Sequence, residues 1–165
     1  MFPNMTSARV VFITASLLLV GCDHYTKHIA KAGLEHQPPR ILAASVLDLD
    51  YTENRDSGFG LLRWMPSAIR TPLLTTVQLV SGIAFLGLAL GRKRVWLGKV
   101  ALLLVGAGAL GNGLDRLFRG YVIDFIHLHH WPVFNVADIY ITVGGIVLVM
   151  ALRRGAPVGP AAQAS

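Results

Sequence analysis

The sequence predicts a membrane all-α protein in which four transmembrane helices carry a small extracytoplasmic β-structure. Apolar residues make up 53% of the 165-residue chain and charged residues only 15%, well below the ~25% charge of soluble domains. The apolar residues also gather in four long runs separated by polar segments, which is typical of membrane spans. A disordered chain would show low hydrophobicity and high charge instead. The length suits one domain, which we place at residues 1–152.

The four runs are compared with the ~20 apolar residues that a helix needs to cross the hydrocarbon core. Residues 71–91 contain no charge, residues 95–114 contain only Lys99, and residues 134–152 contain only Asp138. The first run is shorter, because Asp23 follows it directly, and it reaches spanning length if the helix covers residues 9–30. The predicted spans are therefore 9–30, 71–91, 95–114 and 134–152, with a flexible cytoplasmic tail at 153–165.

The basic residues predict the orientation of these spans. One side of a four-span chain collects seven of the 15 Lys and Arg residues and no Asp or Glu, namely Arg9, Arg92, Lys93, Arg94, Lys99, Arg153 and Arg154. The positive-inside rule then places both termini on the cytoplasmic side of the membrane. The net charge of +6 follows from this topology, so we expect no nucleic acid partner.

Two segments on the opposite side have the patterns of strands. Residues 47–52 alternate between apolar and polar side chains, which indicates a half-buried strand. A turn-like stretch rich in Asn, Asp, Ser and Gly follows, and residues 59–62 are predicted to return as a second strand. Residues 121–128 are rich in β-branched and aromatic side chains. A small sheet over the mouth of the helix bundle is the expected result.

The single cysteine raises an alternative reading of the first span. Leu19-Val20-Gly21-Cys22 resembles a lipobox, at which bacterial prolipoproteins are lipidated and cleaved. Cleavage there would leave three spans and would place the C-terminal basic pair on the wrong side of the membrane. We therefore favour a first helix that is retained. One cysteine also excludes an intrachain disulfide and a cysteine-based zinc site.

Two aspartates are the strongest candidates for chemistry, because a charge at membrane depth costs several kcal/mol. Asp124 lies in the apolar stretch 122–126, and Asp138 lies one turn inside the fourth span. If the loop containing Trp131 and Pro132 returns the chain to the same place, the two carboxylates would share one proton. One could then take a proton from water while the other donates a proton to a carbonyl oxygen, as in aspartic proteases.

Each aspartate also has a structural interpretation. Asp138 could be the third residue of a helix that Asn135 caps, where a carboxylate favours the positive helix end. Asp124 could pair with Arg116 or Arg119, or accept hydrogen bonds from the start of the fourth helix. In a non-catalytic membrane protein, such as a transporter subunit or an assembly factor, the same two carboxylates would form a proton or cation site.

The remaining polar clusters have simpler explanations. His127, His129 and His130 lie near Asp124, but their spacing matches no zinc motif such as HExxH. We interpret them as interfacial residues and predict neither a metal nor a cofactor. Asp23 and Lys27 are four residues apart on one helix face, and an ion pair at the membrane surface would account for them.

Five short motifs in this order resemble those of lipoprotein signal peptidase, the signal peptidase II family of bacterial inner-membrane aspartic proteases. The D-x-x-S/T-K, N-x-G-A-A-F-like, G-N-x-x-D-R, G-x-V-x-D-F and F-N-x-A-D motifs correspond to residues 23–27, 54–60, 111–116, 120–125 and 134–138. The resemblance covers about residues 10–152. One departure is visible, since Arg55 and Asp56 place two charges in the turn where the family has small apolar residues.

The resemblance implies roles for nine residues. It implies Asp124 and Asp138 as the catalytic dyad, a substrate site lined by Asn54, Asn112, Arg116 and Asn135, and support from Asp23, Lys27 and Asp115. It also implies a four-helix bundle with an extracytoplasmic β-cradle and a short interfacial helix. The expected substrate is a prolipoprotein carrying diacylglycerol on its lipobox cysteine, cut on the amino side of that cysteine by a monomeric enzyme in contact with membrane lipid.

Overall fold

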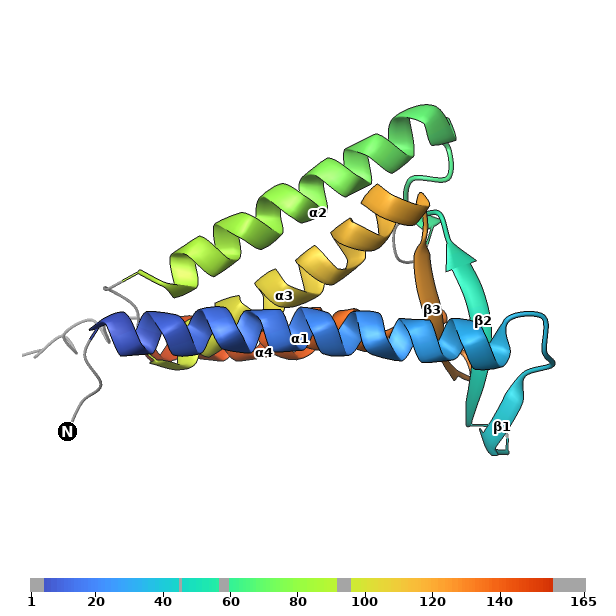
Figure 1. The fold of residues 1–165 in the computed structure, drawn as a ribbon, viewed down its shortest axis with the longest axis horizontal. Coiled ribbons are helices and arrows are strands. Elements are labelled where there is room, and N and C mark those ends of the chain that lie inside the picture. Colours follow the sequence, from blue (N-terminus) through green and yellow to red (C-terminus); the bar gives the residue numbers. More distant parts are fainter. Residues whose placement is uncertain (1–4, 45, 57–59, 92–95, 156–165) are drawn as a thin grey trace, which may run out of the picture.

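The computed structural model describes residues 5–44, 46–56, 60–91 and 96–155, which form four helices and one three-stranded sheet (Figure 1). The helices are α1 (Met5–Leu34), α2 (Ser67–Ala89), α3 (Trp96–Arg119) and α4 (Val136–Gly155). All four are long and apolar enough to cross a membrane. The strands are β1 (Arg40–Ala43), β2 (Leu47–Asn54) and β3 (Val122–Leu128). The predicted fold class is therefore confirmed.

The helices are longer than the predicted spans, mostly at the end that meets the sheet. Helix α1 continues to Leu34, and α3 continues to Arg119. The last turn of α3 carries Arg116 and Arg119. Positive side chains stabilise the C-terminal end of a helix, so these two residues favour the extension. Helix α4 continues to Gly155, so residues 153–155 of the predicted tail are helical. Residues 156–165 of that tail lie outside the described residues.

Helix α3 is the centre of the bundle. In the apolar, membrane-spanning part of α3, 61% is buried inside the protein, compared with 11–17% in the other three helices. Small residues allow the close approach of its neighbours. A Cβ built on Gly108 would lie 2.4 Å from the carbonyl oxygen of Ala137 in α4, and one on Gly106 would lie 3.1 Å from the carbonyl oxygen of Gly82 in α2. Glycine at these positions brings α2 and α4 against the two sides of α3.

The sheet is antiparallel with the strand order β1-β2-β3, so β2 has a partner along both edges. The prediction of strands near residues 47–52 and 121–128 is confirmed. The predicted returning strand is wrong for residues 60–62, which belong to a tight turn; residue 59 lies outside the described residues. Gly60 has a φ of 67° and its carbonyl oxygen accepts a hydrogen bond from Arg63 N. Strand β1, which the sequence analysis did not predict, occupies the free edge of β2.

The sheet lies at one end of the bundle, beside the C-terminal end of α1 and of α3 and the N-terminal end of α4 (Figure 1). Ile123 and Phe125 of β3 are buried against Ala30 of α1 and fix the sheet to the helices. Because the four helices alternate in direction, α1 begins and α4 ends at the opposite end of the bundle. The described residues of the five motifs lie at the end that carries the sheet.

Candidate active site

The two aspartates that the sequence singles out face the same cavity. Asp124 lies in β3 and Asp138 in the first turn of α4. The chain between them turns back on itself, since Phe134 pairs with Ile126 across an antiparallel bridge. Asp124 and Asp138 both line a cavity of about 300 Å³ between α2, α3 and the sheet. The loop at Trp131 and Pro132 thus brings them together, as predicted.

Asn135 fixes the position of both carboxylates. It is the residue before α4, and its side-chain Oδ1 accepts a hydrogen bond from Asp138 N at 3.1 Å. In return Asn135 N donates to Asp138 Oδ2 at 3.2 Å, which completes a reciprocal capping box. Because Oδ1 faces a backbone donor, the amide nitrogen must point the other way, and it donates to Asp124 Oδ1 at 2.6 Å. The predicted helix cap is therefore present, and the same side chain holds Asp124.

Asn112 of α3 holds Asp138 from the other side. Its Nδ2 donates to Asp138 Oδ1 at 2.8 Å, and its Oδ1 accepts from Lys27 Nζ at 2.9 Å. An ammonium group has donors only, so it determines which end of the amide faces Lys27. Lys27 in this way directs the amide hydrogens of Asn112 toward Asp138.

Lys27 is fully buried, and so are the two carboxylates that balance its charge. Its Nζ lies 2.7 Å from Asp23 Oδ2 and 2.9 Å from Asp115 Oδ2. Its hydrogen bonds go to Asp23 Oδ2 and Asn112 Oδ1, and Asp115 places a second negative charge beside it. The pairing of Asp23 with Lys27 is as predicted, and both side chains are 0% exposed, so the pair lies inside the protein. A buried charge needs such partners, since an unpaired one is strongly destabilising.

Asp23 also joins the first helix to the fourth. Its Oδ1 accepts a hydrogen bond from Ala137 N at 3.0 Å, at the positive N-terminal end of α4. Gly111 makes room for this contact, because a Cβ there would lie 2.5 Å from Asp23 Oδ2. Helix α1 runs without a break through Cys22. Its residue Asp23 supplies the carboxylate that supports the site from this side.

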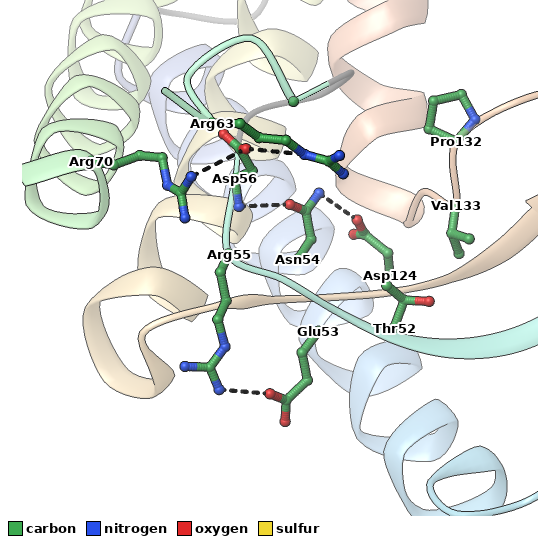
Figure 2. A pocket seen from close by; sticks show the side chains of 11 residues that line it. Thr52, Glu53, Asn54, Arg55, Asp56, Arg63, Arg70, Asp124, Pro132 and Val133 are labelled. Carbon is green, nitrogen blue, oxygen red and sulfur yellow. Dashed lines mark hydrogen bonds and ion pairs between the residues drawn. The ribbon is translucent and has the colours of Figure 1, made fainter. Parts of the chain in front are cut away.

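Asn54, the last residue of β2, binds Asp124 from the sheet side (Figure 2). Its Nδ2 donates to Asp124 Oδ2 at 2.8 Å, while its Oδ1 accepts from Asp56 N at 2.9 Å. The Asp56 side chain lies between Arg63, at 3.7 Å, and Arg70, at 3.4 Å. The charged turn that departs from the family pattern is thus held by ion pairs to the start of α2 and the segment before it.

Arg116 is almost completely buried and connects three parts of the site. Its Nη1 donates to Gln78 Oε1 of α2 at 2.8 Å, and its Nη2 donates to the carbonyl oxygen of Asp56. It also lines the same cavity as the two aspartates. Among the described residues neither Arg116 nor Arg119 forms an ion pair with Asp124, and Arg119 instead pairs with Asp115. The hydrogen bonds of Asp124 come from amides.

Burial and a neighbouring charge alter the acidity of Asp124. Its side chain is 2% exposed. Desolvation, followed by repulsion from Asp138, raises the pKa of Asp124 from 3.8 to about 7, although the amides of Asn54 and Asn135 oppose the change. The negative charge of a neighbouring carboxylate disfavours ionisation of Asp124.

The structure places the predicted site residues in two layers. Asn54, Asn112, Arg116, Asp124 and Asp138 line the cavity. Asn135, Asp23, Lys27 and Asp115 are 0% exposed and lie behind it. Asn135 therefore binds the aspartates and does not form part of the cavity wall.

Gln78 is a cavity residue that the sequence analysis missed. It lines the cavity and anchors Arg116. The signal was a polar amide in the middle of the uncharged span 71–91, which we treated as uniformly apolar. His127 and His129, in contrast, lie toward the other end of β3 and approach Asp48.

Comparison with known proteins supports the resemblance. The family model described as signal peptidase (SPase) II matches residues 15–154. The chain belongs to the signal peptidase II family. It is therefore a membrane aspartic peptidase by family.

Several curated relatives are named lipoprotein signal peptidase. One from Francisella tularensis subsp. novicida is 32% identical over 155 residues, which cover 90% of this chain and 94% of the relative. One from Chlorobium phaeobacteroides is 33% identical over 159 residues, covering 88% and 97%. A solved bacterial membrane enzyme structure has the same fold, with a TM-score of 0.76, 24% identity and coverage of 94% of each chain.

Proposed function

We propose that Asp124 and Asp138 are the catalytic dyad of this signal peptidase II and share one proton when the substrate binds. The observation that carries the proposal is their common cavity, together with Asn135, which donates a hydrogen bond to each of them. The raised pKa of Asp124, about 7, supports a carboxyl that is protonated in part of the population at neutral pH. A matched acid and base near the operating pH is what general acid–base catalysis needs.

The chemical steps follow from these two groups. The ionised carboxylate takes a proton from a water molecule, whose oxygen bonds to the scissile carbonyl carbon. The protonated carboxyl donates its proton to the carbonyl oxygen, which gives a neutral tetrahedral intermediate. When this collapses, the C–N bond breaks, the nitrogen receives a proton from one carboxyl and the intermediate returns a proton to the other. The dyad ends with one proton, as it began.

The substrate in this proposal is a prolipoprotein with diacylglycerol on its lipobox cysteine, cut on the amino side of that cysteine. The relatives are named for lipoprotein signal peptide removal, and two cavities of this chain suit an extended peptide. The cavity of about 300 Å³ and a second one of about 580 Å³ share Asn54 and Asp124. A peptide that occupies both would therefore pass the dyad.

The two cavities differ in chemistry, so they suit different parts of that peptide. The smaller cavity includes Leu74, Val122 and Phe134 and faces the helices, which suits the apolar lipobox residues. The larger one includes Arg55, Arg63 and Arg70 (Figure 2). Lipid chains on the cysteine would remain in the bilayer, beside the exposed apolar side chains of the spans.

We further propose that both termini are cytoplasmic, that the dyad faces the extracytoplasmic side and that the enzyme acts as a monomer. The one-sided basic residues support this orientation. In a chain with Cys22 replaced, an impermeant thiol reagent added from outside should modify Asp56→Cys and spare Trp96→Cys. The reverse labelling pattern would contradict the orientation.

The function is tested with purified protein and a synthetic lipobox peptide that carries diacylglycerol on its cysteine. Mass analysis should show one cut, on the amino side of the modified cysteine, and no cut in the peptide without lipid. A non-catalytic proton or cation site predicts no product at any enzyme concentration. The matched control is Asp50→Asn, an aspartate of β2 outside both cavities, which should cleave at the normal rate.

A further inference from the structure

A second polar cluster lies at the end of the sheet remote from Asn54. Asp48 is the second residue of β2 and pairs in register with His127 of β3, while His129 follows just beyond the end of β3. Residues 127 and 129 are two apart, and their rings stack with centroids 5.5 Å apart and an interplanar angle of 27°. The three side chains therefore project from the same face of the β2–β3 ladder.

The donor atoms of these side chains converge. Asp48 Oδ2 lies 2.8 Å from His129 Nε2 and 4.0 Å from His127 Nδ1. One atom from each residue can be chosen so that all three lie within 4.8 Å of one another. Tetrahedral zinc, with bonds of ~2.0–2.1 Å, holds its ligand atoms about 3.4 Å apart. Small side-chain rotations would be enough to place all three atoms at that separation.

Asp48 shows an unusual feature for a simple ion pair with a histidine. The residue is 9% exposed, and its Oδ1 is buried with no hydrogen-bond partner among the described residues. A buried carboxylate oxygen without a partner costs free energy. A cation bound beside it would offset this cost, whereas the hydrogen bond from His129 satisfies only Oδ2.

We propose that Asp48, His127 and His129 form a binding site for a divalent transition-metal ion of the zinc type. Two imidazoles and one carboxylate are nitrogen and oxygen ligands that Zn²⁺ accepts, with water in the fourth position. Calcium and magnesium are poor occupants because they prefer oxygen ligands alone. The ion would join the start of β2 to the segment that leaves β3.

This site is separate from the peptidase chemistry. None of its three residues lines either cavity at the dyad, and Asp124 and Asp138 need no metal to exchange protons with water and substrate. The expected effect of the ion is on the stability of the sheet, because binding to the folded state alone stabilises that state.

The test uses the full chain in detergent, purified without a polyhistidine tag, treated with chelator and exchanged into buffer at about pH 7.5, because a metal ion competes with protons for its ligands. Isothermal titration with ZnCl₂ should show one Zn²⁺ per chain. His127→Gln, His129→Gln and Asp48→Asn should each weaken binding at least ~10-fold, since loss of even an outer-shell partner costs 10–100-fold. At the same Zn²⁺ concentration, the ion should raise the melting temperature of the parent chain by more than that of each of the three variants.

The matched control is His130→Asn, which removes a neighbouring exposed imidazole. His130 has a φ of 68°, and asparagine tolerates this left-handed conformation. The control should bind Zn²⁺ as the parent chain does. Equal binding by the parent chain and by a folded His127→Gln/His129→Gln double variant, or an equal loss in His130→Asn, would overturn the proposal.

Discussion

Replacement of Asp124 by asparagine should abolish cleavage and at the same time stabilise the protein. The native state of the parent chain carries a carboxyl that is 2% exposed and lies in a common cavity with Asp138. Asparagine has nearly the same shape but cannot ionise. The variant therefore escapes the cost of holding a negative charge in this place.

The magnitude follows from the pKa of Asp124, which rises from 3.8 to about 7 in the folded protein. Because the folded state binds the proton more tightly, the stability conferred by the protonated form is complete below pH 3.8 and is lost as the pH rises to 7. The loss amounts to roughly 4 kcal/mol at pH 8 and under about 2 kcal/mol at pH 5.

Part of this gain is offset by hydrogen bonding. The amides of Asn54 and Asn135 both donate to Asp124, whereas an asparagine in its place has a single acceptor oxygen. One lost hydrogen bond costs about 1 kcal/mol. We therefore expect a net gain of about 3 kcal/mol at pH 8, or a rise in melting temperature of roughly 6–12 °C for a chain of this size.

The assay compares melting in detergent at pH 5 and pH 8, with cleavage of the lipidated peptide measured on the same samples. The difference between parent and variant should be larger at pH 8, and this comparison cancels the titration of other groups. Asp138→Asn and the double variant complete the set. Each single change should reduce cleavage at least ~1000-fold, and the double change should be little worse, since members of one catalytic unit are non-additive.

Two results would refute the reasoning. Identical melting of parent and Asp124→Asn at both pH values would show that Asp124 is not held in a desolvated site beside a second carboxylate. A folded Asp138→Asn variant that cuts at the normal rate would reduce Asp138 to a helix-capping residue, for which asparagine is an adequate substitute. The second result would end the aspartic-dyad mechanism.

Three further predictions concern other parts of the molecule. Arg116→Lys should lower the cleavage rate roughly 10-fold or more, because one ammonium nitrogen cannot replace the planar guanidinium that bonds Gln78 and Asp56 at once. Arg119→Lys is the control, and equal cleavage rates for both variants would contradict this role of the Arg116 guanidinium. Cleavage should persist in EDTA and phenanthroline, measured by the same peptide assay, and a loss that zinc restores would make a metal part of the chemistry. Gly108→Ala should lower the melting temperature by several degrees, since its Cβ would lie 2.4 Å from the Ala137 carbonyl oxygen, whereas Gly145→Ala, with nothing within 4 Å, should melt as the parent chain does.

Membrane helices were the most predictable part of this protein. Their signal is local, because every backbone polar group in lipid must be satisfied within its own helix. The apolar runs therefore identified all four spans. The ends were less predictable, since α1 continues to Leu34 and α3 to Arg119, where the charged Asp115 and Arg116 are buried in the folded bundle.

The sheet was less predictable, because strand pairing is decided between distant segments. The alternating pattern located β2, but nothing local showed that β3 takes one of its edges and β1 the other. The turn after Asn54 pointed to a hairpin that residues 60–62 do not form.

The sequence by itself determined the chemistry that is available: two aspartates in apolar surroundings, three asparagines near them, and charges that need partners. Tertiary structure decided how these groups combine. Lys27 and Asn112 are 85 residues apart in the chain, yet they share a hydrogen bond that orients the amide toward Asp138. The direction of an amide and the acidity of a carboxyl depend on which groups surround them in space, and residue types along the chain do not contain that information.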